Sequence, residues 1–263
     1  MWDLTNTRGS RFRTVFMESR HLPFGHELSE FFDIAREHRP ANPWDTGSSS
    51  LVLHVRGFDD VVHRLRAFGA PVVTFGGMPV TTASGRSILV RDPDGYLVQV
   101  IEASQEDRDA MRGGTVLRAA IRLTVADSDR SLAFYRDLLG FDLAGERLLP
   151  ADDMMVFGLG AGTARETVTR IPGIGADVIL TTFAFPANAG APVHDYRWRL
   201  QDVGSPQFQL QVAGLDDLLA KTREAGYRFL SVGGRPIRRP FGRFVFAVDP
   251  DGVLVEFVEP GQP

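Results

Sequence analysis

Apolar and polar residues alternate in several short runs of the chain, which is the pattern of half-buried β-strands. Such runs occupy residues 11–18, 24–32, 51–56, 117–125, 154–159, 166–170 and 177–185. Two other segments, 59–68 and 131–139, show the spacing of amphipathic helices, and the second ends at Gly140. We expect Ser128 or Asp129 to cap that second helix. Short strands that alternate with short helices predict a mixed α and β architecture.

One turn sequence, Asp-Pro-Asp-Gly, occurs twice, at 92–95 and at 249–252. Proline presets φ, aspartate bonds nearby backbone groups, and glycine tolerates positive φ, so each copy predicts a tight turn. Each turn leads into an apolar run that carries one polar side chain, Gln99 in the first copy and Glu256 in the second. A polar residue inside an apolar strand is a candidate for a buried functional group.

The two turns belong to a longer repeat. Shifting the chain by 157 positions aligns residues 51–102 with 208–259 without a gap, and 19 of the 52 aligned positions are identical. The identities include a glycine before each helix, Gly57 and Gly214, and a Gly-Gly pair in each copy. Glycines at fixed offsets indicate one backbone conformation built twice. The chain therefore contains an internal duplication.

The order of the repeated features resembles the vicinal oxygen chelate superfamily, which includes glyoxalase I, bleomycin-resistance proteins and extradiol dioxygenases. The features are a strand, a helix that begins at Asp-Asp, a Gly-Gly turn and a closing Asp-Pro-Asp-Gly strand. The segment 124–141, Thr-Val-Ala-Asp-Ser-Asp-Arg-Ser-Leu-Ala-Phe-Tyr-Arg-Asp-Leu-Leu-Gly-Phe, is similar to the opening strand and helix of that superfamily. The resemblance implies an α+β fold of tandem paired βαβββ modules, in which each domain curls a mixed sheet into a cup with helices outside.

Under this resemblance, residues 1–105 form a first glyoxalase-like domain, 106–116 a linker and 117–263 a second domain. The first domain has no counterpart of the opening strand and helix, so either the true start lies upstream of Met1 or the domain lacks them. A sheet without its edge strand exposes unpaired backbone groups that another chain can cover. We therefore expect a homodimer, or a compensating interface with the second domain.

The superfamily places metal ligands at up to four positions, one on each central strand, and they are usually His, Glu, His and Glu. In the second domain the positions correspond to Ala120, Ile179, Gln207 and Glu256, and in the first domain to Glu27, Ser50 and Gln99. Alanine and isoleucine offer no donor to a divalent metal. We therefore expect no cofactor. If a divalent metal binds, Glu256 and Gln207 are its ligands.

Strand alternation predicts what else faces the second cup. Gln209 and Gln211 share the face of Gln207, and Arg122 and Thr124 share the face of Ala120. We expect an ion pair between Arg122 and Glu256 at the position of the absent metal, with Glu256 as general base and Arg122 and Gln207 holding negative charge. The other substrate-binding candidates are Gln209, Gln211, Thr124, Tyr196 and Trp198. The alternative is a register shifted by one residue, or glutamines that only face solvent.

In the first domain, His54 shares its strand face with Ser50, and Glu27 and Gln99 are expected nearby. These four residues are candidates for a displaced metal site or an acid–base site. A single histidine on a strand is more often packed or solvated than catalytic, and that alternative stays open.

Composition excludes several classes of function. A net charge of −4 gives no reason to expect nucleic acid or an anionic membrane as partner. The chain has no cysteine, so disulfides, thiolate nucleophiles and thiolate metal sites are excluded. The sequence shows neither a signal peptide nor an apolar stretch of membrane-spanning length, so we expect a cytoplasmic protein.

Three functions fit these observations. The first is an enzyme that acts on a small oxygenated molecule in the cup by metal-independent proton transfer, isomerisation or lyase chemistry. The second is a non-catalytic protein that binds a natural product or an antibiotic. The third is a divalent-metal-dependent enzyme of the glyoxalase or dioxygenase type. A polar cup that contains arginine favours the first, and the sequence does not identify the substrate.

Overall fold

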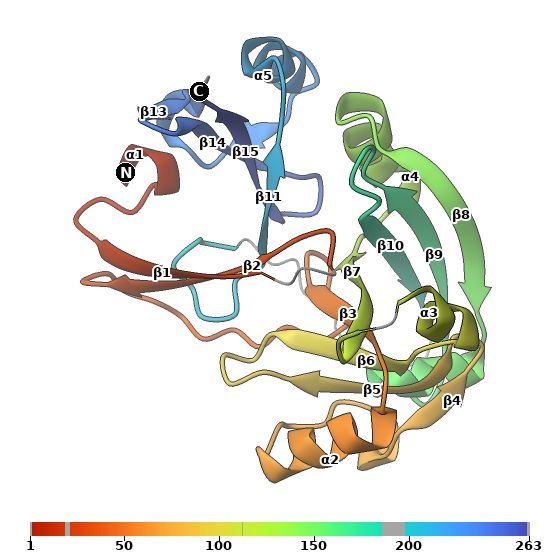
Figure 1. The fold of residues 1–263 in the computed structure, drawn as a ribbon. Coiled ribbons are helices and arrows are strands. Elements are labelled where there is room, and N and C mark those ends of the chain that lie inside the picture. The colour runs from red at the N-terminus through yellow and green to blue at the C-terminus, as the bar shows by residue number, and fades with distance from the viewer. Residues whose placement is uncertain (1, 19–21, 112, 186–197, 262–263) are drawn as a thin grey trace.

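The computed structural model describes residues 2–18, 22–111, 113–185 and 198–261, whose strands form three sheets (Figure 1). No helix in these ranges is long and apolar enough to cross a membrane. The first part contains α1 (Trp2–Thr5), β1 (Arg11–Met17), β2 (His26–Phe32), β3 (Ser49–Val55), α2 (Phe58–Ala67), η1 (Phe75–Gly77), β4 (Val80–Thr82), β5 (Gly85–Arg91), β6 (Leu97–Glu102) and α3 (Gln105–Ala110). The middle part contains β7 (Val116–Thr124), α4 (Ser128–Leu132), η2 (Ala133–Leu138), β8 (Asp142–Leu149), η3 (Ala151–Phe157), β9 (Thr163–Arg170) and β10 (Asp177–Ala184). The last part contains β11 (Gln207–Gln211), α5 (Leu215–Glu224), β12 (Arg228–Phe229), η4 (Val232–Gly234), β13 (Ile237–Arg239), β14 (Gly242–Val248) and β15 (Leu254–Pro260).

The largest sheet has eight strands in the order β4-β5-β6-β3-β7-β10-β9-β8. Its two halves have the same plan, because β3 pairs in parallel with β6 and β7 pairs in parallel with β10. The first strands of the halves, β3 and β7, pair antiparallel at the centre. The sheet curls so that its end strands, β4 and β8, approach each other, with α2 and α4 on the outside (Figure 1). This confirms the α+β fold of curled mixed sheets with outer helices.

The duplicated segments adopt matching local structures. Gly57 and Gly214, which precede α2 and α5, have φ of 66° and 67°. Side chains other than glycine rarely adopt this left-handed conformation, which explains why both copies keep glycine. In each copy, an arginine near the start of a long strand binds an aspartate in the first turn of the helix. Arg86 of β5 binds Asp59, and Arg243 of β14 binds Asp216.

The sheets do not follow the expected division into 1–105 and 117–263. Strands β3 and β7 lie on either side of the expected linker, and they are neighbours in the eight-stranded sheet. The physical reason is that the first strands of two modules satisfy their free edges by pairing with each other. Residues 207–260 form a separate five-stranded sheet, in the order β11-β15-β14-β12 with β13 beside β14, and β1 and β2 form a two-stranded ribbon. The homodimer that the sequence led us to expect stays a prediction.

A single apolar layer joins the eight-stranded and five-stranded sheets. It contains the outward-facing residues of β7 and β10, the helical segments α4, η2 and α5, and the apolar face of β11, β14 and β15. Phe134, Tyr135 and Phe257 are completely buried in it. Figure 1 shows α4 and α5 facing each other across this layer. The helices therefore cover the convex faces of both sheets, and the opposite faces remain for the candidate sites.

The second Asp-Pro-Asp-Gly turn fastens the five-stranded sheet to the helical segment after β7. The Asp249 carboxylate accepts a hydrogen bond from the Tyr135 hydroxyl at 2.7 Å and from two backbone N–H groups of its own turn. The Asp251 carboxylate accepts from the backbone N–H of Ala126 and from the Ser131 hydroxyl. Asp92, the counterpart of Asp249, binds backbone N–H groups of its own turn. The second copy therefore uses the turn as an anchor between modules.

Burial of Asp249 predicts a loss of stability as pH rises. Burial is the main cause that raises its pKa to about 7, and the hydrogen bond from Tyr135 opposes the shift. A raised folded-state pKa gives stability that is complete below the unfolded-state pKa and is lost as pH rises through about 7. The unfolding free energy of the natural chain should fall between pH 5 and pH 8. In Asp249→Asn we expect this fall to be smaller by about 1–3 kcal/mol. Urea unfolding at both pH values measures it, with Asp94→Asn, an exposed residue of the first turn, as control. An unchanged difference between the two pH values contradicts the prediction.

Three elements differ from the sequence prediction. Residues 154–159, predicted as a strand, fall mostly within the 3₁₀ turn η3, which lies between Pro150 and the left-handed Gly158. The N-cap of α4 is Asp127, whose side chain accepts from the N–H groups of Asp129 and Arg130, and not Ser128 or Asp129. The strand β8 was not predicted, because its mostly exposed residues lack alternation.

Candidate functional site

The inner face of the eight-stranded sheet carries four of the expected ligand positions, Ser50, Gln99, Ala120 and Ile179. Ser50 lies opposite Arg122, and Arg122 lies opposite Ile179, in neighbouring strands. Alanine and isoleucine provide no ligand atom, and the Gln99 amide is bound to other side chains. The donor set at these positions therefore does not fit a divalent metal.

Arg122 is almost completely buried, at 3% exposure, and its partner is Glu166. Its Nη2 and Nε donate to Glu166 Oε1 at 2.8 Å and 3.2 Å, and its Nη1 donates to Gln99 Oε1. The guanidinium also lies 5.1 Å from the centre of the Phe157 ring. The expected ion pair between Arg122 and Glu256 is therefore wrong, because Arg122 pairs with Glu166 and Glu256 is bound by Gln209.

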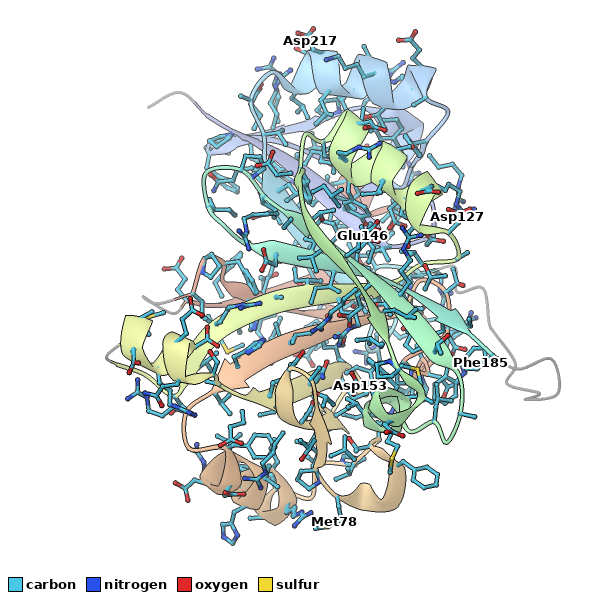
Figure 2. The ribbon with its side chains drawn as sticks, turned by 90° about the vertical axis from the view of Figure 1, so that its right-hand side faces the viewer. Met78, Asp127, Glu146, Asp153, Phe185 and Asp217 are labelled. Atoms are coloured by element: carbon cyan, nitrogen blue, oxygen red, sulfur yellow. The ribbon has the colours of Figure 1, made fainter. Side chains whose placement is uncertain are left out.

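Glu166 is fully buried and also binds Arg147 through its second oxygen. Burial alone disfavours its charge, but the guanidinium groups of Arg122 and Arg147 hold the pKa of Glu166 below its ordinary value. The buried side chains of η3, including Met154 and Phe157, fill the space next to this group. Figure 2 shows side chains crowded around Asp153 of η3 and between the strands. The centre of the larger cup is thus occupied by the protein's own side chains.

His54 lies on the same inner face, near the end of β3. Its Nδ1 is 3.8 Å from Asp107 Oδ2, and burial together with the charge of Arg118 lowers its pKa to about 4. His54 is therefore neutral at physiological pH. The expected grouping of His54, Gln99 and Ser50 with Glu27 is wrong, because Glu27 belongs to the separate β1–β2 ribbon.

The five-stranded sheet carries the other candidate group, centred on Glu256. The predicted alternation in β11 is confirmed: Phe208 and Leu210 are buried in the apolar layer, whereas Gln209 and Gln211 are exposed on the other face. Gln209 lies opposite Glu256 in the register of β11 and β15, and its Nε2 donates to Glu256 Oε2 at 2.8 Å. Glu256 is 9% exposed. The site therefore joins a buried carboxylate to an exposed amide.

Two carboxylates approach each other at this site from different sheets. Burial is the main cause that raises the pKa of Glu256 to about 7, the hydrogen bond from Gln209 opposes it, and the negative charge of Glu27 raises it further. Glu27 lies on β2 and accepts a hydrogen bond from the Ser29 hydroxyl at 3.0 Å. Phe31 is on the same ribbon face and belongs to one apolar cluster with Leu254 and Val258, which share the strand face of Glu256, so this face of the ribbon faces Glu256.

The other expected binding residues have different surroundings. Thr124 is buried in the eight-stranded sheet, and its hydroxyl donates to the Pro43 carbonyl at 2.6 Å. Trp198 belongs to the apolar cluster that contains Leu254 and Val258, the neighbours of Glu256 on its strand face, and its indole N–H donates to the Gly47 carbonyl at 2.8 Å. Tyr196 lies outside the described residues.

Among the described residues, the donor set near Glu256 does not fit the metal that the superfamily implies. It contains two carboxylates, of Glu27 and Glu256, and the amides of Gln207 and Gln209. Within the described ranges, no group of three or more His, Cys, Asp or Glu side chains is placed to hold a metal ion.

Sequence reasoning missed Glu166 and Arg147. A signal for Glu166 is present, because Ala164, Glu166 and Val168 share one face of β9 and only the middle residue is charged. A carboxylate between two small apolar residues on an inward face requires a buried cation. Arg147 gives no comparable signal, since it lies in the mostly exposed β8.

Comparison with known proteins decides the family. Residues 118–257 match the family model described as the Glyoxalase/Bleomycin resistance protein/Dioxygenase superfamily. The chain belongs to this superfamily. No curated protein sequence matches the chain significantly. The superfamily assignment agrees with the curled sheets and with the repeated modules.

Solved structures of superfamily members share the fold. Glyoxalase I from Zea mays is 16% identical and has a TM-score of 0.61, over 98% of this chain and 86% of that one. A putative dioxygenase from Bacillus subtilis subsp. subtilis str. 168 is 13% identical and has a TM-score of 0.52, over 84% of this chain and 64% of that one. At these identities the likeness concerns the fold alone.

Proposed function

We propose that this superfamily member catalyses proton transfer on a small, uncharged, oxygenated molecule at Glu256, as an isomerase or lyase. The observation that carries the proposal is a buried carboxylate with a pKa of about 7, hydrogen-bonded to an exposed amide. A general base is most effective when its pKa lies near the working pH. Burial in the five-stranded sheet brings Glu256 into that range, and the exposed Gln209 gives the site access to solvent.

In the proposed reaction, the Glu256 carboxylate removes a proton from a carbon next to a carbonyl group. The C–H electron pair forms a C=C bond, and the carbonyl oxygen becomes an enolate oxygen. The side-chain amides of Gln207 and the exposed Gln209 are the donors available to this oxygen, because both lie on the face of Glu256. In an isomerisation, the proton of the substrate's α-hydroxyl group moves to the enolate oxygen, and Glu256 returns its proton to the former carbonyl carbon. In a lyase reaction, the β-hydroxyl group leaves as water with the proton that Glu256 holds, and the enolate oxygen becomes a carbonyl oxygen again.

The charges at the site favour an uncharged substrate. Glu27 is the charged side chain that acts on the pKa of Glu256, and it is negative. Arg122, which the sequence analysis assigned to anion binding, is bound to Glu166 in the other sheet. A substrate carboxylate would therefore meet two like charges, those of Glu256 and Glu27. Neutral hydroxyaldehydes and hydroxyketones fit the site better.

Hydrogen exchange with solvent tests the proposal even when the product is unidentified. The protein is incubated in D₂O with a panel of neutral hydroxyaldehydes and hydroxyketones and a matched panel of hydroxy acids, and NMR follows loss of the α-proton signals. We expect exchange in the neutral panel, with a rate that rises with pH through about 7 as Glu256 loses its proton.

Two outcomes contradict the proposal. A rate that is independent of pH between 5 and 9 is incompatible with Glu256 as the base. Binding of panel members without exchange or conversion would instead favour the non-catalytic binding function.

A further inference from the structure

A cavity lies away from Glu256, at a place where three parts of the chain meet. It has a volume of about 450 Å³ and lies between the tip of the β1–β2 ribbon, the first residues of β7 and the turn between β9 and β10. Its apolar lining includes Leu22, Pro23, Leu117 and Ile174. Pockets for small molecules have volumes of several hundred cubic ångströms and combine apolar walls with a few polar groups.

The polar groups of this cavity are two arginines and one aspartate. Arg170 binds Asp177 through two hydrogen bonds, at 2.8 Å and 3.3 Å, and Asp177 is nearly buried. The Arg118 guanidinium is 3.8 Å from the same carboxylate, which is too long for a hydrogen bond. Asp177 is therefore shared by two guanidinium groups, and Arg170, which Asp142 also faces, holds it more closely than Arg118 does.

Arg118 is positioned to bind an anion. Its side chain is 52% exposed, and its contact with a charged group is the long one to Asp177. Asp177 is held by the two hydrogen bonds from Arg170, so Arg118 keeps hydrogen-bond donors for a ligand. The guanidinium fork matches the two oxygens of a carboxylate.

We propose that this cavity binds a small molecule with one carboxylate and a short apolar body. The carboxylate binds Arg118, whose contact with Asp177 is too long for a hydrogen bond, and the apolar body lies against Leu22, Leu117 and Ile174. A second negative charge on the ligand would find Arg170 already paired with Asp177. This site shares no residue with the Glu256 site. Its proposed ligand carries a negative charge, whereas the substrate proposed for Glu256 is uncharged.

Titration calorimetry with octanoate as the probe tests this site. We expect one octanoate per chain and at least tenfold weaker binding of the uncharged octanamide, because only the carboxylate neutralises Arg118. Arg118→Met keeps most of the apolar stem and should raise the octanoate Kd about tenfold or more. Ile174→Asn removes part of the apolar wall at an exposed turn and should also weaken octanoate.

Matched controls separate this site from general effects. Arg165→Met removes an exposed arginine of the neighbouring strand β9, which binds Glu146, and should leave the octanoate Kd unchanged. Glu256→Gln should also leave it unchanged, so failure of the proposed catalytic function does not affect this result. No octanoate binding, equal affinity for octanamide, or an unchanged Kd in Arg118→Met would each overturn the proposal.

Discussion

Glu256→Gln is expected to lower the rate of α-proton exchange about 10²–10⁴-fold, the range that a positioned general base contributes. Glutamine cannot accept the proton at neutral pH, but its carbonyl oxygen still accepts the hydrogen bond from Gln209. The sheet and the hydrogen bond should therefore persist. Affinity for the substrate, measured by calorimetry at saturating protein, should change less than threefold.

Two other glutamates provide the comparison. Glu30→Gln alters an exposed residue of β2 that binds Arg13, and it should leave the rate unchanged. Glu27→Gln removes the negative charge that raises the pKa of Glu256, so its rate profile should shift to lower pH without losing the maximal rate. If Glu256→Gln keeps more than a tenth of the exchange rate, Glu256 is not the base.

The raised pKa of Glu256 connects the proposed activity with stability. The charged form that acts as base is the form that burial disfavours, so activity rises and folding stability falls as pH increases through about 7. A site of this kind keeps a destabilised group because the chemistry requires it. Glu256→Gln should consequently lose less stability than the natural chain between pH 5 and pH 8.

Local patterns predicted the modules well. The glycine offsets predicted two copies of one backbone, and the φ values of Gly57 and Gly214 agree within one degree. Alternation in β11 placed Gln209 and Gln211 on one face and Phe208 on the other, as the structure has them. These features depend on sterics and burial within a few residues, which the sequence carries directly.

The sequence could not show which modules share a sheet. Alternation shows which face of a strand a residue occupies, but not which strand lies beside it. Arg122 and Glu256 were therefore both assigned to an inner face, although they belong to different sheets. Pairing of β3 with β7 depends on two free edges far apart along the chain. The order of strands in the sheet therefore depends on three-dimensional packing, which local patterns do not show.

Glu166→Gln is expected to destabilise the protein by about 3–5 kcal/mol, the cost of leaving a buried charge without its partner. Arg122 is 3% exposed, and its remaining contacts are the neutral Gln99 and the ring of Phe157. Urea unfolding at pH 7 measures the loss. Glu146→Gln on β8 breaks an exposed pair with Arg165 and should cost less than about 1 kcal/mol. A loss below about 1 kcal/mol for Glu166→Gln would show that water reaches Arg122.

The double variant Arg122→Met with Glu166→Leu separates a structural role from a catalytic one. Removing both charges leaves neither a buried arginine nor a buried glutamate without its partner, so the double variant should be more stable than Glu166→Gln. Arg147 also loses its partner Glu166, but its side chain is exposed and can bind water instead. If Arg122 stabilises the fold and Glu256 alone is the base, the double variant should retain the α-proton exchange of the natural chain. Loss of exchange in a folded double variant would return Arg122 to the catalytic site that the sequence predicts for it. Retention would place the chemistry at the five-stranded sheet, where Glu27 of the β1–β2 ribbon acts on Glu256.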